Sequence, residues 1–254
     1  MVWDAGLAHG AHRPRPQRGD QQRAHRTMSL LCINDLRFGW QPQQPVLDIA
    51  HLQLAAGETL FLRGPSGSGK STLLNLIGGV LAPQHGSVSL LGQPLERLKP
   101  AQRDRLRADH IGFVFQQFNL LPYLDAISNV MLPCAFSRRR AERAGDAHAQ
   151  ARELLQRLQL NERSLAGRPA AQLSVGQQQR VAAARALIGA PELLIADEPT
   201  SALDSDSRDG FLTLLFDECR RVGAALLFVS HDRSLEARFD RVIDLVAINR
   251  VGMS

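Results

Sequence analysis

The chain has 254 residues, a formal net charge of +5 and 44% hydrophobic residues. This length suits one large domain or two small ones with a buried core, and no stretch approaches the roughly 20 consecutive apolar residues of a membrane-spanning helix. We therefore expect a soluble or peripheral protein, and the mild charge gives no reason to expect nucleic acid as a partner.

The three cysteines, Cys32, Cys134 and Cys219, lie far apart and form no Cys-x-x-Cys pair. An odd number at such spacing argues against both a disulfide framework and a zinc site. A reduced, cytoplasmic setting is therefore expected.

Residues 1–27 carry five arginines against two aspartates and show no apolar periodicity. Such a composition is typical of a disordered extension, and it lacks the apolar core of a secretory signal. A solvated tail is favoured over a metal site for its histidines, His9, His12 and His25. An orderly pattern begins at Met28, so we expect the folded domain at residues 28–254 and hypothesise that Met28 is the natural start.

Between Leu30 and Arg63, short apolar segments alternate with turn residues, as LLCI, LRFGW, VLDIAHLQL and ETLFLR. This alternation predicts an antiparallel β layer beside a main sheet, with Thr59–Leu62 as a buried strand of that sheet. Trp40 has two open interpretations, a packed surface aromatic or a ring that stacks on an adenine.

The segment Gly64–Thr72 reads GPSGSGKST and follows this strand directly. It matches the phosphate-binding loop, in which glycines let backbone N–H groups approach phosphate oxygens. Lys70 adds a positive charge, Ser71 offers a hydroxyl to magnesium, and the helix that begins here directs its positive end at the same anion. The nucleotide contacts predicted from this loop are Gly64, Pro65, Ser66, Gly67, Ser68, Gly69, Lys70, Ser71 and Thr72.

After this helix, SVSLLGQPL predicts a strand, a turn and an edge strand, and residues 100–109 form a charged helical pattern. In IGFVFQQFNLLP an apolar strand runs into Gln116. This glutamine is either a plain loop residue or a side chain that holds a magnesium-bound or attacking water. Residues 125–172 are predicted to form a separate helical block.

The segment LSVGQQQRVAAARALIGAPELLIADEPTSALD contains the second polar cluster. Ser174 is predicted to cap a helix from about Val175 to Ile188. Leu193–Ala196 has the continuous apolar character of a central parallel strand and ends in Asp197 and Glu198. Two carboxylates at the end of a buried strand need a cation or a proton. Asp197 is therefore predicted to bind magnesium, and Glu198 to orient or deprotonate the attacking water.

Ala224–Ser230 is a further buried-strand pattern and leads into His231. A histidine after a strand is commonly structural, but at the sheet edge where ligands collect it is a candidate contact to the γ-phosphate. The remaining DRVIDLVAINR predicts one or two short strands.

Taken in order, these motifs resemble those of the nucleotide-binding subunit of ABC transporters, over roughly Leu31–Leu245. GPSGSGKST matches the Walker A loop, FVFQQ the Q-loop, LSVGQQQR the ABC signature, LLIADE the Walker B strand, SALD the D-loop and SHD the switch-histidine region. The resemblance implies an α/β fold with a P-loop NTPase core, whose sheet is mixed and mainly parallel. It also implies an antiparallel β subdomain and a helical subdomain at about residues 118–180.

The resemblance further implies an ATP hydrolase that uses Mg²⁺ and works as a head-to-tail dimer, of two copies or with a paralogue. Each ATP would contact the Walker motifs of one subunit and Ser174, Gly176 and Gln177 of the other. By the same resemblance, Trp40 stacks on the adenine and Gln116 links magnesium to the membrane partner. Asp204 would reach across the dimer, and His231 would steady the γ-phosphate.

The implied partner is an integral membrane permease, which places the protein in the cytoplasm, on the inner face of the membrane. The compact length and the GFVFQQFNLLP loop are similar to the small ATPases of lipoprotein-releasing and macrolide-exporter systems. Two alternatives are an ATP-dependent clamp that transmits force without transport, as in cell-division relatives, and a soluble ABC protein that acts on DNA or ribosomes. The latter relatives usually carry a coiled-coil insertion or two fused ATPase halves, and this chain has neither.

One departure from the family pattern is Val175, where a glycine is usual. A valine is strained wherever the backbone requires a positive φ. The effect of Val175 on turnover therefore depends on the backbone conformation at this position.

Overall fold

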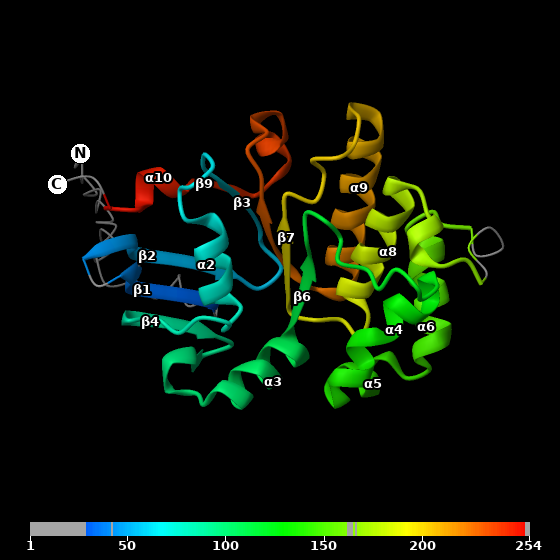
Figure 1. Cartoon of the computed structure of the whole chain (residues 1–254), viewed down its shortest axis with the longest axis horizontal. Coiled ribbons are helices and arrows are strands. Elements are labelled where there is room, and N and C mark those ends of the chain that lie inside the picture. Colours follow the sequence, from blue (N-terminus) through cyan, green and yellow to red (C-terminus); the bar gives the residue numbers. More distant parts are fainter. Residues whose placement is uncertain (1–28, 42, 162–164, 166, 252–254) are drawn as a thin grey trace, which may run out of the picture.

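The computed structural model describes residues 29–41, 43–161, 165 and 167–251, so the predictions for residues 1–27 and Met28 lie outside the described residues. Two sheets and a set of helices make up the described part (Figure 1). The larger sheet has five strands, and every strand pair in it is parallel. In spatial order these strands are β6 (Ile111–Val114), β7 (Leu193–Asp197), β8 (Ala225–Val229), β3 (Thr59–Arg63) and β9 (Arg241–Asp244).

The second sheet has four antiparallel strands, which confirms the predicted antiparallel layer. In spatial order they are β2 (Gln44–Ala55), β1 (Ser29–Gln41), β4 (His85–Leu90) and β5 (Gln93–Pro94). The segments LLCI and LRFGW belong to one strand, β1, with a register shift between Asn34 and Arg37. Asp35 has a φ of 47° there, so the apparent turn residues form an irregularity within a strand.

Helix α2 (Lys70–Ile77) packs between the two sheets (Figure 1). Its buried apolar side chains belong to one core with the antiparallel sheet and with Leu60 and Leu62 of β3. They are Leu73, Leu74, Leu76 and Ile77. Phe61 points to the opposite face of β3, because side chains alternate along a strand, and it belongs to a second core. Each face of the parallel sheet is therefore covered.

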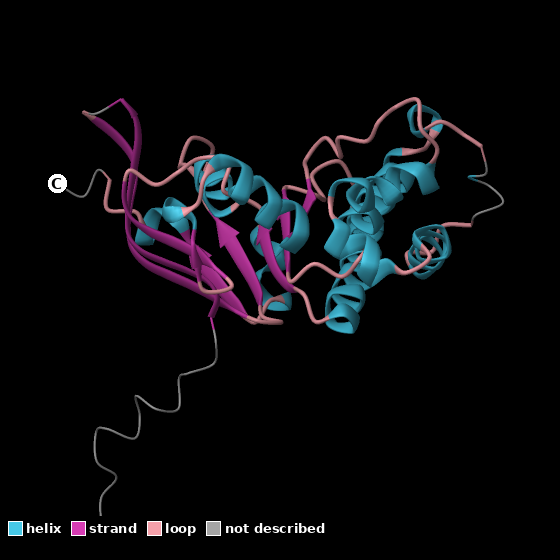
Figure 2. Ribbon diagram, turned by 90° about the horizontal axis from the view of Figure 1, so that it is seen from below, coloured by secondary structure: helices cyan, strands magenta, loops and turns pink. Residues whose placement is uncertain are grey.

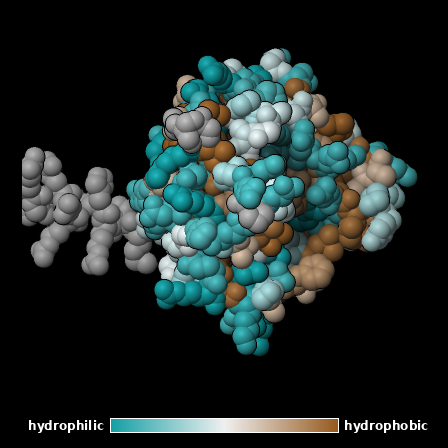
Figure 3. Space-filling view, turned by 60° about the vertical axis from the view of Figure 1, so that its left-hand side comes forward, coloured by the Kyte–Doolittle hydropathy of each residue, from teal (hydrophilic) through white to brown (hydrophobic). Residues whose placement is uncertain are grey.

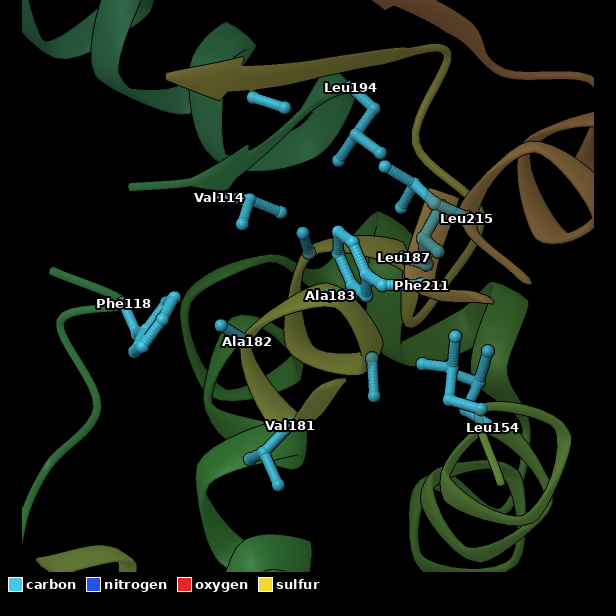
Figure 4. Close-up of a cluster of buried hydrophobic side chains, with 14 of the residues drawn as sticks. Val114, Phe118, Leu154, Val181, Ala182, Ala183, Leu187, Leu194, Phe211 and Leu215 are labelled. Atoms are coloured by element: carbon cyan, nitrogen blue, oxygen red, sulfur yellow. The ribbon is translucent and has the colours of Figure 1, made fainter. Parts of the chain in front are cut away.

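The second core is formed by α8 (Val175–Leu187), α9 (Ser205–Val222) and the helical block against the other face of the sheet. Figure 4 shows Ala183, Leu187 and Phe211 gathered beside the strand residues Val114 and Leu194. The small residues Ala182, Ala183 and Ala184 are fully buried, which allows α8 to lie close to the sheet.

The helical block contains α4 (Ala126–Phe136), α5 (Arg138–Ala144) and α6 (Ala147–Arg157), and Figure 2 shows a group of helices on one side of the molecule, opposite the antiparallel sheet. Each of the three begins at a side-chain cap: Asp125 accepts from Ser128 N, Ser137 from Arg140 N, and Asp146 from Ala149 N. The charged helix predicted at residues 100–109 is α3 (Pro100–His110).

A carboxylate outside the core attaches this block to the sheet. Glu192, directly before β7, accepts hydrogen bonds from Arg139 (2.5 Å) and Arg143 (2.7 Å) of α5, and His110 Nδ1 lies 2.8 Å away. Burial favours the neutral acid, but the hydrogen bonds from His110 and Arg139 outweigh burial and hold the pKa of Glu192 at about 2. The carboxylate is therefore charged and stabilises the junction at neutral pH.

The end of the described chain holds one strand, β9, followed by the short helix α10 (Leu245–Ile248). The sequence pattern predicted one or two strands here, and only the first forms. Asp244 ends the strand because its side chain accepts a hydrogen bond from Val246 N and so caps α10. The described residues also include three 3₁₀ segments, η1 (Leu95–Arg97), η2 (Ala170–Gln172) and η3 (Arg233–Arg238).

Within the described ranges, no helix combines the length and the apolar character needed to cross a bilayer. In the view of Figure 3, hydrophilic side chains cover most of the visible face, and hydrophobic ones gather towards one side.

Candidate functional site

A cavity of about 590 Å³ lies at the carboxyl end of the parallel strands. Its volume falls in the range of small-molecule sites, about 300–1,000 Å³. It brings together most of the predicted site residues, from five separate segments of the chain, and adds Val46 from a sixth. The lining residues are Trp40, Val46, Ser66, Gly67, Gly69, Lys70, Ser71, Thr72, Gln116, Asp197, Glu198 and His231.

The loop between β3 and α2 forms the floor of this cavity. Gly67 and Gly69 have φ values of 80° and 96°, a left-handed conformation that side chains disfavour. A Cβ at Gly69 would also lie 2.8 Å from Leu47 Cδ2. The left-handed backbone favours glycine at both positions, and this conformation lets the loop curve around a ligand.

The groups of this loop fit a phosphate anion. Lys70 Nζ donates to the carbonyl oxygens of Gly64 (2.6 Å) and Pro65 (3.0 Å), so its charge is held over the loop. Helix α2 begins at Lys70 without a side-chain cap, which leaves its first N–H groups available to an anion. Ser68 Oγ is buried and has no hydrogen-bond partner among the residues that the structure describes.

Asp197 and Glu198 stand opposite this loop, at the end of β7. Burial raises the pKa of Asp197, the charge of Glu198 raises it further, and Lys70 opposes both. A bound cation would relieve this repulsion. Asp197, Ser71 and Gln116 line the same cavity and supply oxygen atoms, the ligand type that Mg²⁺ prefers.

The described residues contain no group of three or more His, Cys, Asp or Glu side chains able to hold a metal by themselves. A Mg²⁺ ion in this cavity would be held by one or two carboxylates together with the phosphates of the substrate.

Glu198 is held by the adjacent strand. Its φ is 47°, which is uncommon for a residue with a side chain, and its N–H donates to Val229 O (2.9 Å). His231 Nδ1 lies 2.9 Å from Glu198 Oε1, and Ser230 Oγ lies 3.4 Å from Oε2. Both carboxylate oxygens are thus oriented by residues that follow β8, towards a cavity shared with the loop.

Gln116 follows β6 and its side chain is exposed at the cavity. The loop after it is held by Arg185, which donates to the carbonyl oxygens of Phe118 (2.6 Å) and Asn119 (2.6 Å). Both of these residues have positive φ values. Sequence reasoning missed Arg185, although a single arginine within the apolar run VAAARAL was a signal that its charge has a specific partner.

Trp40 stands at the rim of the cavity with 65% of its surface exposed. It contacts Phe38 edge to face, with ring centroids 5.3 Å apart. The contact with Phe38 agrees with a packed surface aromatic, and stacking of the exposed ring on an adenine stays a prediction. Val46 is a further lining residue that the sequence did not single out, because an apolar strand residue gives no signal of its own.

Seven predicted contacts are not among the residues that line the cavity. Three of them, Gly64, Pro65 and Ser68, belong to its loop, and the other four lie on separate segments, namely Ser174, Gly176, Gln177 and Asp204. Ser174 caps α8 as predicted: its Oγ accepts from Gln177 N (3.3 Å), and its N–H donates to Gln177 Oε1 (2.9 Å). Asp204 caps α9 and accepts from Ser207 N (2.9 Å) and Ser207 Oγ (2.9 Å). These hydrogen bonds lower the pKa of Asp204.

Val175 is the first residue of α8 and is not among the residues with positive φ. The valine therefore introduces no backbone strain here. With 47% of its surface exposed beside Ser174, it adds an apolar side chain to the outer face of the signature segment.

The comparisons of this chain with known proteins agree on one family. The ABC transporter family model matches residues 47–201. The lipoprotein-releasing system ATP-binding protein LolD of Anaeromyxobacter dehalogenans is 46% identical over 202 residues, which cover 80% of this chain and 83% of that protein. The macrolide export ATP-binding/permease protein MacB of Rhodopseudomonas palustris is 44% identical over 195 residues, 76% of this chain and 29% of that protein.

Among solved structures, the dimeric ATP-binding cassette MJ0796 in a post-hydrolysis state, bound to ADP and Pi, matches with a TM-score of 0.74. It is 37% identical, and the match covers 84% of this chain and 93% of that chain. The P-loop fold and the resemblance to lipoprotein-releasing and macrolide-exporter ATPases are therefore confirmed. The chain belongs to the ABC transporter family, as one of its ATP-binding components.

Proposed function

We propose that this chain hydrolyses ATP as a head-to-tail dimer and thereby drives a separate membrane permease. Each ATP lies between the cavity of one chain and Ser174, Gly176 and Gln177 of the other. The observation that carries this proposal is the division of the predicted site: the loop, both carboxylates and His231 share one cavity, whereas the signature residues lie outside it. The dimeric arrangement of the related MJ0796 cassette supports the same conclusion.

Nucleotide binding follows from the groups that line the cavity. Lys70 and the N-terminus of α2 neutralise the phosphates, and Trp40 stacks on the adenine from the rim. Asp197, Ser71 and Gln116 hold magnesium. When bound, this ion neutralises charge on the phosphates and so lowers the barrier to attack.

Hydrolysis needs a group that takes the proton of the attacking water. Glu198 is placed for this role, since its two oxygens are oriented by His231 and Ser230 and it faces the same cavity as Lys70. His231 keeps the carboxylate in place and contacts the γ-phosphate. Closure of a second chain over the cavity excludes bulk water, retains the attacking water and completes the site.

The permease is proposed to be part of an exporter or a lipoprotein-releasing system. This choice is supported by the 46% sequence identity to LolD, which is named as the ATP-binding protein of a lipoprotein-releasing system. The protein would then sit in the cytoplasm against the inner face of the membrane, with domain boundaries at residues 28–254 and a helical subdomain at about 118–180. That subdomain takes in α4, α5, α6 and the start of α8.

The test is to express the chain in its native host with an affinity tag, identify membrane proteins that co-purify, and reconstitute the complex in vesicles. We expect a permease to be recovered and to raise ATP turnover, and Lys70→Ala to lose nucleotide binding in the same preparation. A membrane partner whose ATPase-dependent activity moves no substrate would favour the clamp. Recovery of ribosomes or DNA instead would favour a soluble ABC protein.

A further inference from the structure

Helix α9 begins at the D-loop, and its first turn is rigidly built. Asp204 caps the helix through Ser207, and the carbonyl oxygen of Asp204 accepts the N–H of Arg208 (3.0 Å). The side chains of Phe211, Leu212 and Leu215 anchor the following turns in the core. The position of Arg208 is therefore fixed relative to Asp204, one helical turn away.

Arg208 forms an ion pair with Asp232, the residue directly after His231. The contact is made by NH1 of Arg208, and the buried Nε of this residue has no hydrogen-bond partner among the described residues. The other oxygen of Asp232 accepts from Ser234 N (3.0 Å) and Ser234 Oγ (2.7 Å). The carboxylate thus joins α9 to the switch-histidine loop.

The same loop is bonded to the catalytic carboxylate. Asp232 N donates to Ser230 Oγ (3.1 Å), which lies 3.4 Å from Glu198 Oε2, and His231 Nδ1 lies 2.9 Å from Glu198 Oε1. A continuous series of contacts therefore runs from the D-loop turn through Arg208 and the switch loop to Glu198.

We propose that Arg208 is a positioning residue: its pairing with Asp232 makes the D-loop turn and the switch-histidine loop move together, so that Asp204 sets the position of His231. This inference rests on the proposed function, in which Asp204 contacts the second chain. Closure of the dimer would then reach Glu198 through Arg208. Two sequence positions define this pairing. Arg208 is the fourth residue after Asp204 of the D-loop, and Asp232 directly follows His231.

A second contact, between α9 and the segment η3 that follows the switch-histidine loop, offers a matched control. Arg238 of η3 donates to Asp209 Oδ1 (3.0 Å) and to Thr213 Oγ1 (2.8 Å), and its guanidinium lies over the Phe216 ring. This contact also joins α9 to the segment after the switch loop, but further from His231. Loss of the Asp209 contact tests general stability without touching the contacts to His231.

The test compares Arg208→Gln, Asp232→Asn and their double variant with Arg208→Lys and Asp209→Asn in the full chain. We expect each of the first two to lower kcat about tenfold with KM changed less than about twofold, since binding is untouched. The double variant should be no worse than either single one, because both remove the same pair. Arg208→Lys should recover most of the turnover, and Asp209→Asn should match the wild-type chain.

A second readout does not depend on turnover. In the nucleotide-free chain, the imidazole NMR signal of His231, assigned with His231→Gln, should shift in Arg208→Gln and Asp232→Asn and stay in place in Asp209→Asn. An unmoved signal, or wild-type kcat in Arg208→Gln, would overturn the inference while leaving the proposed function intact. Absence of ATP hydrolysis by the wild-type chain would instead count against the proposed function, and the NMR comparison would still decide the role of Arg208.

Discussion

The Nδ1 atom of His231 lies 2.9 Å from the Oε1 atom of Glu198, so the residues that follow β8 and β7 form one hydrogen-bonded pair. The two strands are parallel neighbours, with Asp197 paired to Val229, and their carboxyl ends therefore meet at the same edge. The positive φ of Glu198 turns its side chain towards this edge. The pair gives the carboxylate a fixed direction before any ligand binds.

Substitution of Glu198 by glutamine tests this pair. The amide has the same shape and still reaches His231, but it takes no proton from water. We expect kcat to fall by about 10²–10⁴-fold with ATP affinity within about threefold of wild type, and an ATP-bound dimer to accumulate in size-exclusion chromatography. The exposed Glu142→Gln on α5 is the control. Turnover of Glu198→Gln close to that of Glu142→Gln would refute the role of the carboxylate.

Substitution of Asp197 by asparagine should separate stability from activity. Burial and the neighbouring Glu198 raise the pKa of Asp197, so its charged form destabilises the folded protein. The nucleotide-free variant should therefore melt at a higher temperature than the wild-type chain at pH 7. Its magnesium-dependent turnover should be lost.

The pH dependence follows from the same shift. Below the unfolded pKa of about 3.9 the acid is neutral in both states and the variant has no advantage. Its advantage should grow as the pH rises through the folded pKa and then level off. A variant less stable than wild type at pH 7 would mean that the carboxylate is stabilised by its surroundings, against the cavity electrostatics described above.

Substitution of Glu192 by glutamine should have the opposite pH dependence. The folded pKa of about 2 lies below the unfolded value, so the stabilisation is complete above about pH 4.3 and is lost as the pH falls towards 2. We expect the variant to lose about 1–3 kcal/mol at pH 7, and the difference from wild type to shrink below about pH 4 in urea titrations. The exposed Asp217→Asn on α9 should change little at any pH. A pH-independent loss in Glu192→Gln would assign its effect to packing.

Substitution of Val175 by glycine restores the usual signature residue. Because Val175 has a helical backbone, the change relieves no strain. We expect turnover within about threefold of wild type, equivalent to about 0.7 kcal/mol in the barrier. A gain of tenfold or more in the ATPase assay would show instead that the exposed valine side chain obstructs closure of the dimer.

The strands and the polar residues at their ends were predictable from the sequence. Leu193–Ala196 and Ala224–Ser230 are continuous apolar runs, and such runs predict central parallel strands whose carboxyl ends meet. That relationship placed Asp197, Glu198 and His231 at one edge. The helix cap at Ser174 and the glycine-rich loop could be predicted from their local sequences alone.

Other features needed the tertiary structure. Arg185 donates to Asn119, which lies 66 positions away in the chain, and a pattern of apolar residues cannot predict such a long-range contact. Helix α9 was not predicted, because its polar first turns hid the helical spacing of Phe211, Leu215 and Cys219. Helix α10 took the place of a possible second strand because Asp244 caps it by accepting a hydrogen bond from Val246 N, and the apolar pattern of this segment does not reveal that cap.

The central claim is that each working site contains the cavity of one chain and the signature segment of another. The most direct measurement mixes two inactive variants, Lys70→Ala, with a disabled cavity, and Ser174→Arg, with a disabled signature segment. A mixed dimer holds one intact site, so ATPase activity should return to about a quarter of the wild-type rate in an equimolar mixture. No activity in the mixture, with mixed dimers shown to form, would contradict the composite site, as would full activity of Ser174→Arg alone.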